Sequence, residues 1–491
     1  MADALAALRA AFSGRLLTDG ADTGAFLTDW RGKWTGRALA VAQPDDAAGV
    51  AAVLGWCHAN RVPVVPQGGN TGLSGGATPD ASGAALVLSL TRLNKVRHVD
   101  TVNNTMTVEA GVTLQQVQHA AKDAGRLFPL SLAAQGSCTI GGNLATNAGG
   151  VQVLRYGNTR ELCLGLEVAT PQGGLWDGLR GLRKDNTGYD LRDLYIGSEG
   201  TLGVITAAVL KLFPLPAGRA VAFVAVPSPG AAVELLQLCQ AQLGAGLTAF
   251  ELMGATCMAL VERHVPNARL PLADASPWYV LMEVSDALDE ARAQAALEGI
   301  LEQALERELA TDAALSASLA QFQSLWALRE DISESQMAEG KTIKHDIALP
   351  ISRIPRFIAE TDGAIAQAFP GLRLVIFGHL GDGNLHYNLS PAQGTRDADA
   401  VAAFLALEAP LNRLVHDAVV AHGGSISAEH GLGVLRRDES ARYKSALELQ
   451  LMRSVKIALD PLGLMNPGKL LGQAADVPAA IHSPIRNQDP P

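Results

Sequence analysis

Three glycine-rich loops near the start of the chain constrain its fold more than any other feature. They span residues 66–73 (PQGGNTGL), 136–150 (GSCTIGGNLATNAGG) and 197–205 (GSEGTLGVI), and the first directly follows a strand-like apolar run. Glycine has no Cβ, so backbone N–H groups can approach a phosphate closely, and small hydroxyls add donors. One such loop alone is more often a tight turn than a ligand site. Three in one domain favour a dinucleotide held between facing loops.

The glycine pattern also argues against two common nucleotide sites. G-x-G-x-x-G does not occur in the sequence, so a NAD site of the Rossmann type is disfavoured. Residues 463–469 match G-x-x-x-x-G-K, but Leu470 replaces the required Ser or Thr, and Pro467 lies inside the loop. We therefore interpret that match as accidental rather than as a P-loop. Glycine alone leaves the identity of the dinucleotide open.

The chain has 491 residues, which is long enough for more than one hydrophobic core. Short strands alternate with helices before a Pro-containing segment, and longer Ala/Leu/Glu-rich helices follow it, so we expect an α+β fold. The expected parts are a helical lead (1–37), a nucleotide-binding domain (38–216), a second α+β domain (217–407), a helical segment that packs back on the first domain (408–471), and a polar, Pro-rich, disordered tail (472–491).

Composition excludes several classes of partner and location. The net charge is −10 without a basic stripe, so no nucleic-acid partner is expected. The five cysteines include no CxxC pair, which fits a reducing compartment. A secretory signal and an apolar run of membrane-spanning length are both missing from the sequence. We therefore expect a cytoplasmic protein without a transmembrane segment.

Two further motifs bring together residues that can bind a metal. In FGHLGDGNLHYN, apolar runs flank a Gly-Asp-Gly-Asn turn, which predicts a hairpin with His379 and His386 on paired strands. SAEHGLG supplies Glu429 and His430. Each residue alone is more often an ordinary core or surface side chain. Two imidazoles that bracket a tight turn, with a carboxylate available as a third ligand, are one way to bind a divalent metal with coordination positions left open.

The three glycine motifs, P-x-G-G-x-T-G-L, G-x-x-x-x-G-G-N and I-G-S-E-G-T-L-G-V-I-T, together resemble the FAD-linked oxidase family, which has the fold of vanillyl-alcohol oxidase. The resemblance covers about residues 38–471. It implies a two-subdomain FAD-binding fold with an α+β cap domain and a C-terminal helical segment. Members with covalent flavin often have His in the first loop, where this chain has Asn70 and Thr71, so non-covalent FAD is expected. The implied FAD contacts are Pro66, Gly68, Gly69, Asn70, Thr71, Gly72, Leu73, Gly136, Ser137, Thr139, Gly142, Asn143, Gly150, Glu199, Gly200 and Ile205.

G-H-x-G-D-G-N-x-H followed by S-x-E-H-G-x-G is similar to the metal-dependent branch of this family. The resemblance implies that His379, His386 and Glu429 bind zinc or manganese and that His430 is the catalytic base. A metal on the hydroxyl oxygen makes the alcohol proton easier to remove, and a neutral imidazole accepts that proton. The α-carbon hydride then passes to N5 of the FAD.

W-x-L-R-E-x-I-S and K-H-D-I-x-L-P resemble the D-2-hydroxyglutarate dehydrogenase branch, which often has Thr where this chain has Ser333. The resemblance implies that Arg329, Ser333 and Lys344 hold the distal carboxylate of a 2-hydroxy acid, while Asn388 and His430 contact its hydroxy-acid end. Arg329 and Ser333 are four residues apart in a run of helical period, so we expect them to share a helix face. Most Arg and Lys residues are, by contrast, only solvated surface charge.

The expected reaction is oxidation of D-2-hydroxyglutarate to 2-oxoglutarate, with D-malate and D-lactate as competing substrates. Alternatives are a D-lactate or glycolate dehydrogenase or oxidase of the same fold, a flavin-free metal hydrolase, and a non-catalytic binding protein. The resemblance suggests an electron-transfer flavoprotein, a quinone or a cytochrome as electron acceptor. The sequence leaves the oligomeric state open, although homodimers are common in the family that the chain resembles.

Overall fold

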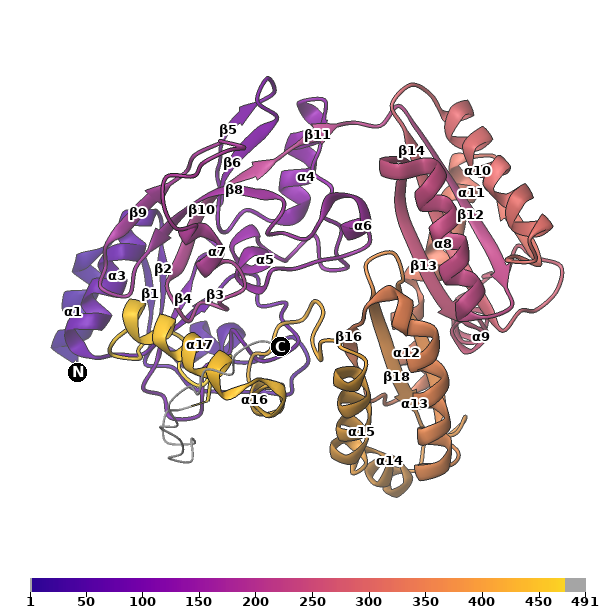
Figure 1. Cartoon of the computed structure of the whole chain (residues 1–491). Helices are drawn as coiled ribbons and strands as arrows, with labels where there is room; N and C mark the ends of the chain where they lie inside the picture. Colours follow the sequence, from indigo (N-terminus) through magenta and orange to yellow (C-terminus); the bar gives the residue numbers. More distant parts are fainter. Residues whose placement is uncertain (1, 473–491) are drawn as a thin grey trace, which may run out of the picture.

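The computed structural model describes residues 2–472, which form two domains (Figure 1). The first domain contains a four-stranded sheet in the order β1-β2-β4-β3 and a five-stranded antiparallel sheet in the order β5-β6-β10-β8-β9. Its strands are β1 (Gly14–Leu17), β2 (Ala40–Pro44), β3 (Val64–Gln67), β4 (Leu86–Ser89), β5 (Val96–Asp100), β6 (Thr105–Glu109), β8 (Cys163–Ala169), β9 (Leu175–Gly178) and β10 (Val204–Lys211), with a short pair β7 (Arg126–Leu127) and β11 (Phe213–Pro214).

Local capping explains where the helices of this domain begin. Asp46 accepts a hydrogen bond from Gly49 N at the start of α3, and Thr113 and Gln116 form a capping box at the start of α4. The helices are α1 (Ala2–Ala11), α2 (Gly20–Thr23), α3 (Ala47–Asn60), α4 (Leu114–Asp123), α5 (Ile140–Thr146), α6 (Val153–Tyr156) and α7 (Leu191–Tyr195), with a 3₁₀ turn η1 (Gly24–Phe26).

The lead over residues 1–37 is not only helical. Its residues Gly14–Leu17 form β1, which pairs antiparallel with β2 and adds an edge to the four-stranded sheet. Leu8 and Leu16 are buried in the core of that sheet. Because β1 pairs with β2 and these leucines are buried, the lead is an integral part of the first domain. A four-residue strand carries too little periodic pattern to be predicted from sequence.

The second domain is built on a seven-stranded antiparallel sheet in the order β15-β12-β14-β13-β17-β18-β16. One face packs against α8, α10, α13 and α15, and the other packs against α9, α11 and α12. The strands are β12 (Gly218–Val226), β13 (Leu247–Gly254), β14 (Trp278–Asp286), β15 (Asp312–Leu315), β16 (Asp346–Ala348), β17 (Arg373–His379) and β18 (Asn384–Ser390). The helices are α8 (Pro229–Leu243), α9 (Ala255–His264), α10 (Glu290–Glu306), α11 (Leu319–Glu330), α12 (Ile332–Glu339), α13 (Ile354–Ala368), α14 (Ala398–Leu405) and α15 (Glu408–Ala421), with 3₁₀ turns η2 (Gly244–Gly246) and η3 (Ile351–Arg353).

The expected boundary at residue 408 is wrong, because α15 belongs to the second domain. Leu411, Val415 and Val419 of α15 lie in the same core as α13, and Figure 1 shows the two helices side by side. The chain returns to the first domain only after this helix, through α16 (Arg437–Tyr443) and α17 (Ala446–Leu459). Apart from Gly472, the tail expected to be disordered lies outside the described residues. No helix within residues 2–472 combines the length and the apolar composition needed to span a membrane.

Candidate active site

The three glycine-rich loops line one cavity of about 950 Å³, part of which is open to solvent. All three loops contribute, as the sequence predicts. The predicted FAD contacts that line this cavity are Pro66, Gly68, Gly69, Asn70, Thr71, Gly72, Thr139, Gly142, Asn143, Glu199, Gly200 and Ile205. The other four, Leu73, Gly136, Ser137 and Gly150, do not line it and stay predictions. Lining residues outside the predicted FAD contacts include three motif positions, Gly141, Ser198 and Val204. Others are Gln67, Ser74, Gly76, Leu90, Ala145 and Thr146.

The contact between the first two loops explains why they need glycine. A Cβ at Gly68 would collide with Thr139 Oγ1, and a Cβ at Gly69 would collide with the carbonyl oxygen of Ser137. Thr139 Oγ1 is buried and has no hydrogen-bond partner among the described residues. A hydroxyl left without a partner beside close-packed backbone can donate to a phosphate, so these loops fit the pyrophosphate of a dinucleotide.

The predicted histidine hairpin is present, and its register brings both imidazoles to one face. β17 and β18 pair with Phe377 opposite His386, and His379 ends β17 just before the turn. His386 and Asn388 alternate with buried Leu385, Tyr387 and Leu389, which belong to the core under the opposite face. Period-two alternation therefore directs the polar residues of β18 away from that core.

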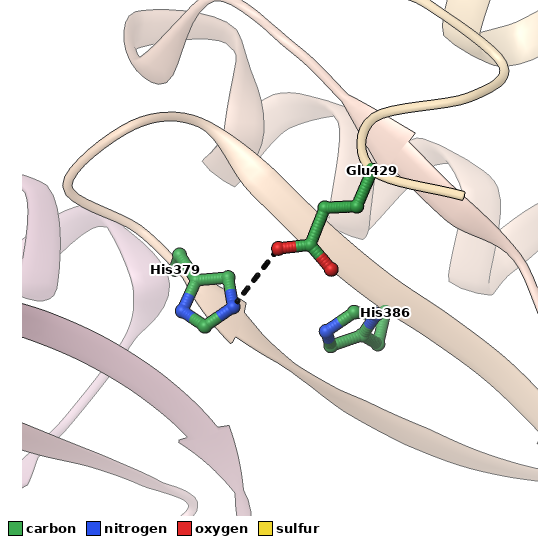
Figure 2. Close-up of side chains that lie close together, drawn as sticks. All are labelled: His379, His386 and Glu429. Atoms are coloured by element: carbon green, nitrogen blue, oxygen red, sulfur yellow. Dashed lines mark ion pairs between the residues drawn. The ribbon is translucent and has the colours of Figure 1, made fainter. Parts of the chain in front are cut away.

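Glu429 joins the two histidines from a loop after α15. One ligand atom from each of His379, His386 and Glu429 lies within 4.8 Å of the others, and Figure 2 shows the three side chains facing one another. His379 Nδ1 lies 2.7 Å from Glu251 Oε1, while its Nε2 lies 3.4 Å from Glu429 Oε1. A carboxylate behind one imidazole nitrogen, with the other nitrogen directed at the cluster, is typical of a metal-binding histidine. The three residues therefore fit a divalent cation.

Asp346 fixes the loop that carries Glu429 and His430. Its Oδ2 accepts hydrogen bonds from the backbone N–H groups of both residues at 3.0 Å, and it lies 3.3 Å from His430 Nδ1. Its Oδ1 accepts from Asn384 Nδ2 at 2.9 Å, and Asp346 pairs with His386 across β16 and β18. His430 also lines the cavity of the glycine loops. The predicted base, metal ligands and dinucleotide loops thus meet at one site.

Burial and neighbouring charges shift the pKa values of the two clustered histidines in opposite directions. Burial opposes the charged form of His379, but Glu251 and Glu429 outweigh it and raise the pKa of His379 to about 10. Burial, together with the positive charges of His379 and Arg329, lowers the pKa of His386 well below its usual value. Burial also opposes the charge on Asp346, yet His430, Arg436 and the hydrogen bond from Glu429 N keep its pKa low. His386 is therefore ready to bind a cation, whereas His379 must give up a proton when a cation binds.

Arg329 and Ser333 do not share a helix face, which corrects the sequence-based expectation. α11 ends at Glu330, and Ser333 lies on the separate helix α12. Arg329 is buried, whereas Ser333 is exposed. The Arg329 guanidinium forms an ion pair with Glu251 at 2.8 Å and stacks 4.8 Å from the centre of the Phe377 ring. Arg329 therefore lies beside the histidine cluster rather than with Ser333.

Lys344 lies along the edge of β18 that pairs with β16, whereas Arg329 lies along the edge that pairs with β17. The bridge between Ile343 and Leu389, and the bond from Tyr387 N to His345 O, continue the β16–β18 pairing and place Lys344 opposite Asn388. The Asn388 side chain accepts from His345 N and donates to Gln336. Phe377, under the Arg329 guanidinium, pairs with β18 from its opposite edge. Arg329 and Lys344 thus flank the polar face of β18.

Within residues 2–472, Lys344 forms no ion pair with a carboxylate. Burial, followed by the positive charge of Arg31, lowers the pKa of Lys344. Arg31 belongs to the segment between Thr28 and Thr35, which contacts Asn70 through Thr28 and Glu408 of α15 through Lys33. Two neighbouring cations favour an anionic ligand. No local motif marked Arg31, whereas Glu251 and Asp346 could have been found as carboxylates within apolar strands.

Comparison with known families agrees with this geometry. Residues 38–178 match an FAD binding domain, and residues 215–470 match the C-terminal domain of FAD linked oxidases. The fold and its cavity therefore define a two-domain flavoprotein oxidoreductase. The chain belongs to the FAD-linked oxidase family.

Named relatives share nearly the whole length of the chain. D-2-hydroxyglutarate dehydrogenase of Xanthomonas citri pv. viticola is 43% identical over 95% of this chain and 96% of its own. The mitochondrial D-2-hydroxyglutarate dehydrogenase of Bos taurus is 40% identical over 96% of this chain and 83% of its own. In structure, p-cresol methylhydroxylase superimposes with a TM-score of 0.74 over 96% of this chain and 97% of its own at 14% identity, which shows the shared fold.

Proposed function

We propose that this protein oxidises D-2-hydroxyglutarate to 2-oxoglutarate, using FAD and a divalent metal. The observation that carries the proposal is the position of His430. This side chain lines the cavity of the three glycine loops. Its Nδ1 faces the Asp346 carboxylate, which also accepts a hydrogen bond from the backbone N–H of Glu429. A base, a metal-ligand set and a flavin cavity at one site match the chemistry of alcohol oxidation.

Each group has a separate task in this proposal. When bound, FAD would supply the hydride acceptor, and a metal held by His379, His386 and Glu429 would supply a Lewis acid. His430 accepts the hydroxyl proton at Nε2, because its Nδ1 faces Asp346. The Asp346 carboxylate orients the imidazole and stabilises the positive charge that develops on it.

The two cations that flank β18 favour a dicarboxylate. Neighbouring strands lie about 4.8 Å apart, so groups on the two sides of β18 are about 10 Å apart. We propose that Lys344 holds the distal carboxylate, with Arg31 reinforcing the positive field. Arg329, expected from the sequence at that same carboxylate, lies beside Glu251 and Phe377, and we propose that it faces the carboxylate beside the hydroxyl. The exposed Ser333 stays a predicted substrate contact. Relatives described as D-2-hydroxyglutarate dehydrogenases agree with this substrate class.

We further propose that the FAD is non-covalent and the metal is zinc or manganese. The first loop offers Asn70, whose amide donates to Thr28 O, and Thr71, neither of which forms a flavin bond as histidine does. Imidazole and carboxylate ligands suit both metals. The electron acceptor is proposed to be an electron-transfer flavoprotein, a quinone or a cytochrome. Acid precipitation of the protein should release the flavin into the supernatant.

Steady-state kinetics with a panel of acids tests the substrate. We expect kcat/KM for D-2-hydroxyglutarate to exceed that for D-lactate by about 100-fold, because a monocarboxylate leaves a buried cation without its anion. D-malate, which has a shorter spacing between its carboxylates, should fall between them. A preference for D-lactate or glycolate would contradict the dicarboxylate assignment, and hydrogen peroxide formed in proportion to turnover would identify an oxidase.

A further inference from the structure

Glu199 occupies a strained and fully tethered position in the third glycine loop. Its φ is 51°, in the left-handed region that a side chain with a Cβ rarely adopts, between Gly197 and Gly200 with φ of 80° and 71°. Its N–H donates to Ala145 O at 2.8 Å, and its carbonyl accepts from Asn466 Nδ2 at 2.7 Å. The backbone of the first domain thus holds one buried carboxylate in a fixed direction.

That carboxylate is directed at the loop of the predicted base. Glu199 Oε1 accepts from Leu432 N, and Oε2 accepts from Gly433 N, both at 2.8 Å. A Cβ on Gly431 would lie 2.9 Å from Oε1, so glycine is needed for this approach. Ser74 adds a hydrogen bond to the carbonyl of His430 at 3.2 Å. Two short hydrogen bonds to successive N–H groups form a geometrically specific clamp.

The loop over residues 429–433 is therefore held by carboxylates from both domains. Asp346 of the second domain binds the N–H groups of Glu429 and His430, while Glu199 of the first domain binds those of Leu432 and Gly433. Neither clamp alone specifies where the loop lies relative to both the flavin cavity and the histidine hairpin. Among residues 2–472, only Glu199 joins the loop to the wall of the cavity through a carboxylate.

We infer that Glu199 is a positioning residue, which places Glu429 and His430 against the flavin cavity through the backbone of residues 432–433. The hydrogen bonds alone support the clamp. Its importance for catalysis rests on the proposed function. It assigns the Glu199 carboxylate a role different from the FAD contact that the sequence motif implies. If the Glu199 carboxylate contacts FAD, its removal should lower the flavin content. If it clamps the loop, its removal should loosen residues 429–433 and weaken metal binding.

The test compares Glu199→Gln with Glu167→Gln in the FAD-loaded protein. Glu167 is a matched control, because it is a similarly buried carboxylate of the first domain that binds Arg97 and Thr206 instead of the loop. Glutamine keeps the size but turns one acceptor into a donor facing an N–H. We expect hydrogen exchange in the peptide over residues 430–435, and the dissociation constant for Zn²⁺ or Mn²⁺, to rise about tenfold or more in Glu199→Gln only. Flavin content should stay equal to wild type.

Two further variants keep the test decisive. Glu199→Asp retains the charge but cannot reach both N–H groups, so it should fall between wild type and Glu199→Gln. Gly431→Ala pushes on the carboxylate from the opposite side and should reproduce the faster exchange if Glu199→Gln fails to fold. Loss of flavin from Glu199→Gln, with exchange and metal affinity of the remaining holoprotein unchanged, would overturn the inference. If wild type never reduces its flavin with a 2-hydroxy acid but loop exchange still responds, the proposed function fails while the clamp stands.

Discussion

The two domains build their parts of the site by different means. The first domain uses backbone: its glycine loops approach one another where any side chain would collide, and the cavity lies between them. The second domain uses side chains projected from one face of a sheet, together with a loop more than forty residues further along the chain. A backbone site tolerates few substitutions at glycine but depends little on side-chain chemistry. A side-chain site should lose its chemistry, and keep its cofactor, when one residue changes.

His430→Asn should give the largest effect and separates the two domains most clearly. Asparagine removes the proton acceptor but leaves the glycine loops and the three metal-ligating side chains in place. We expect flavin reduction by D-2-hydroxyglutarate to slow by about 10²- to 10⁴-fold with FAD and metal content unchanged. Anaerobic stopped-flow absorbance measures the rate. An unchanged rate would remove His430 from the mechanism.

His386→Ala should remove the metal and leave the flavin. The variant deletes one of three ligands within 4.8 Å of one another, so the remaining pair binds a divalent ion at least about 10-fold more weakly. Metal analysis and flavin absorbance of the same sample give the two occupancies. If the flavin is lost together with the metal, the two halves of the site are not as independent as their construction suggests.

Lys344→Met should change specificity more than general activity. Methionine keeps most of the apolar stem and removes the charge opposite Asn388. We expect kcat/KM for D-2-hydroxyglutarate to fall about 30- to 100-fold, equivalent to about 2–3 kcal/mol, while D-lactate is little affected. Equal losses for both acids would mean that Lys344 supports the fold rather than the distal carboxylate.

The smallest expected effect concerns stability in the second domain. Burial first, and then neighbouring positive groups including Arg436, lower the pKa of His345 to about 3 and of His416 to about 4. Their folded-state values lie below the unfolded value near 6.5, so protons favour the unfolded chain, and stability falls as pH drops below about 6.5. Between pH 7.5 and pH 5.5, His345 and His416 should lower the free energy of unfolding in urea by about 1–3 kcal/mol, while His379, with its raised pKa, acts in the opposite direction. His416→Leu should reduce this difference, and an unaltered difference would exclude His416 as a source.

The sequence predicts the first domain's loops well because they are local. Glycine spacing within one motif is enough to place most lining residues, and the predicted hairpin turn is enough to bring His379 and His386 to the same face of paired strands. Contacts that depend on strand register, or on a distant segment folding back to the site, are not local and cannot be read from one motif. Glu251 reaches His379 only through the pairing of β13 with β17, and Asp346 reaches His430 only through the loop after α15.

Helix boundaries limited the prediction in a second way. The helical periodicity of the sequence predicts one helix that runs through Ser333. In the structure, α11 ends at Glu330, and a new helix begins after Asp331. Composition likewise placed a boundary at residue 408, because an amphipathic helix does not reveal which of two cores its apolar face will join. The proposed metal ligands and the proposed base follow from motifs, whereas the residues that hold them in place required the structure.

The central claim is that the flavin cavity and the His379–His386–Glu429 cluster work as one site. Its most direct test is anaerobic bleaching of the flavin absorbance by D-2-hydroxyglutarate, before and after metal removal with a chelator. We expect rapid bleaching with the metal, at least about 100-fold slower bleaching without it, and recovery when Zn²⁺ or Mn²⁺ is added back. Equal bleaching rates with and without metal would contradict the account.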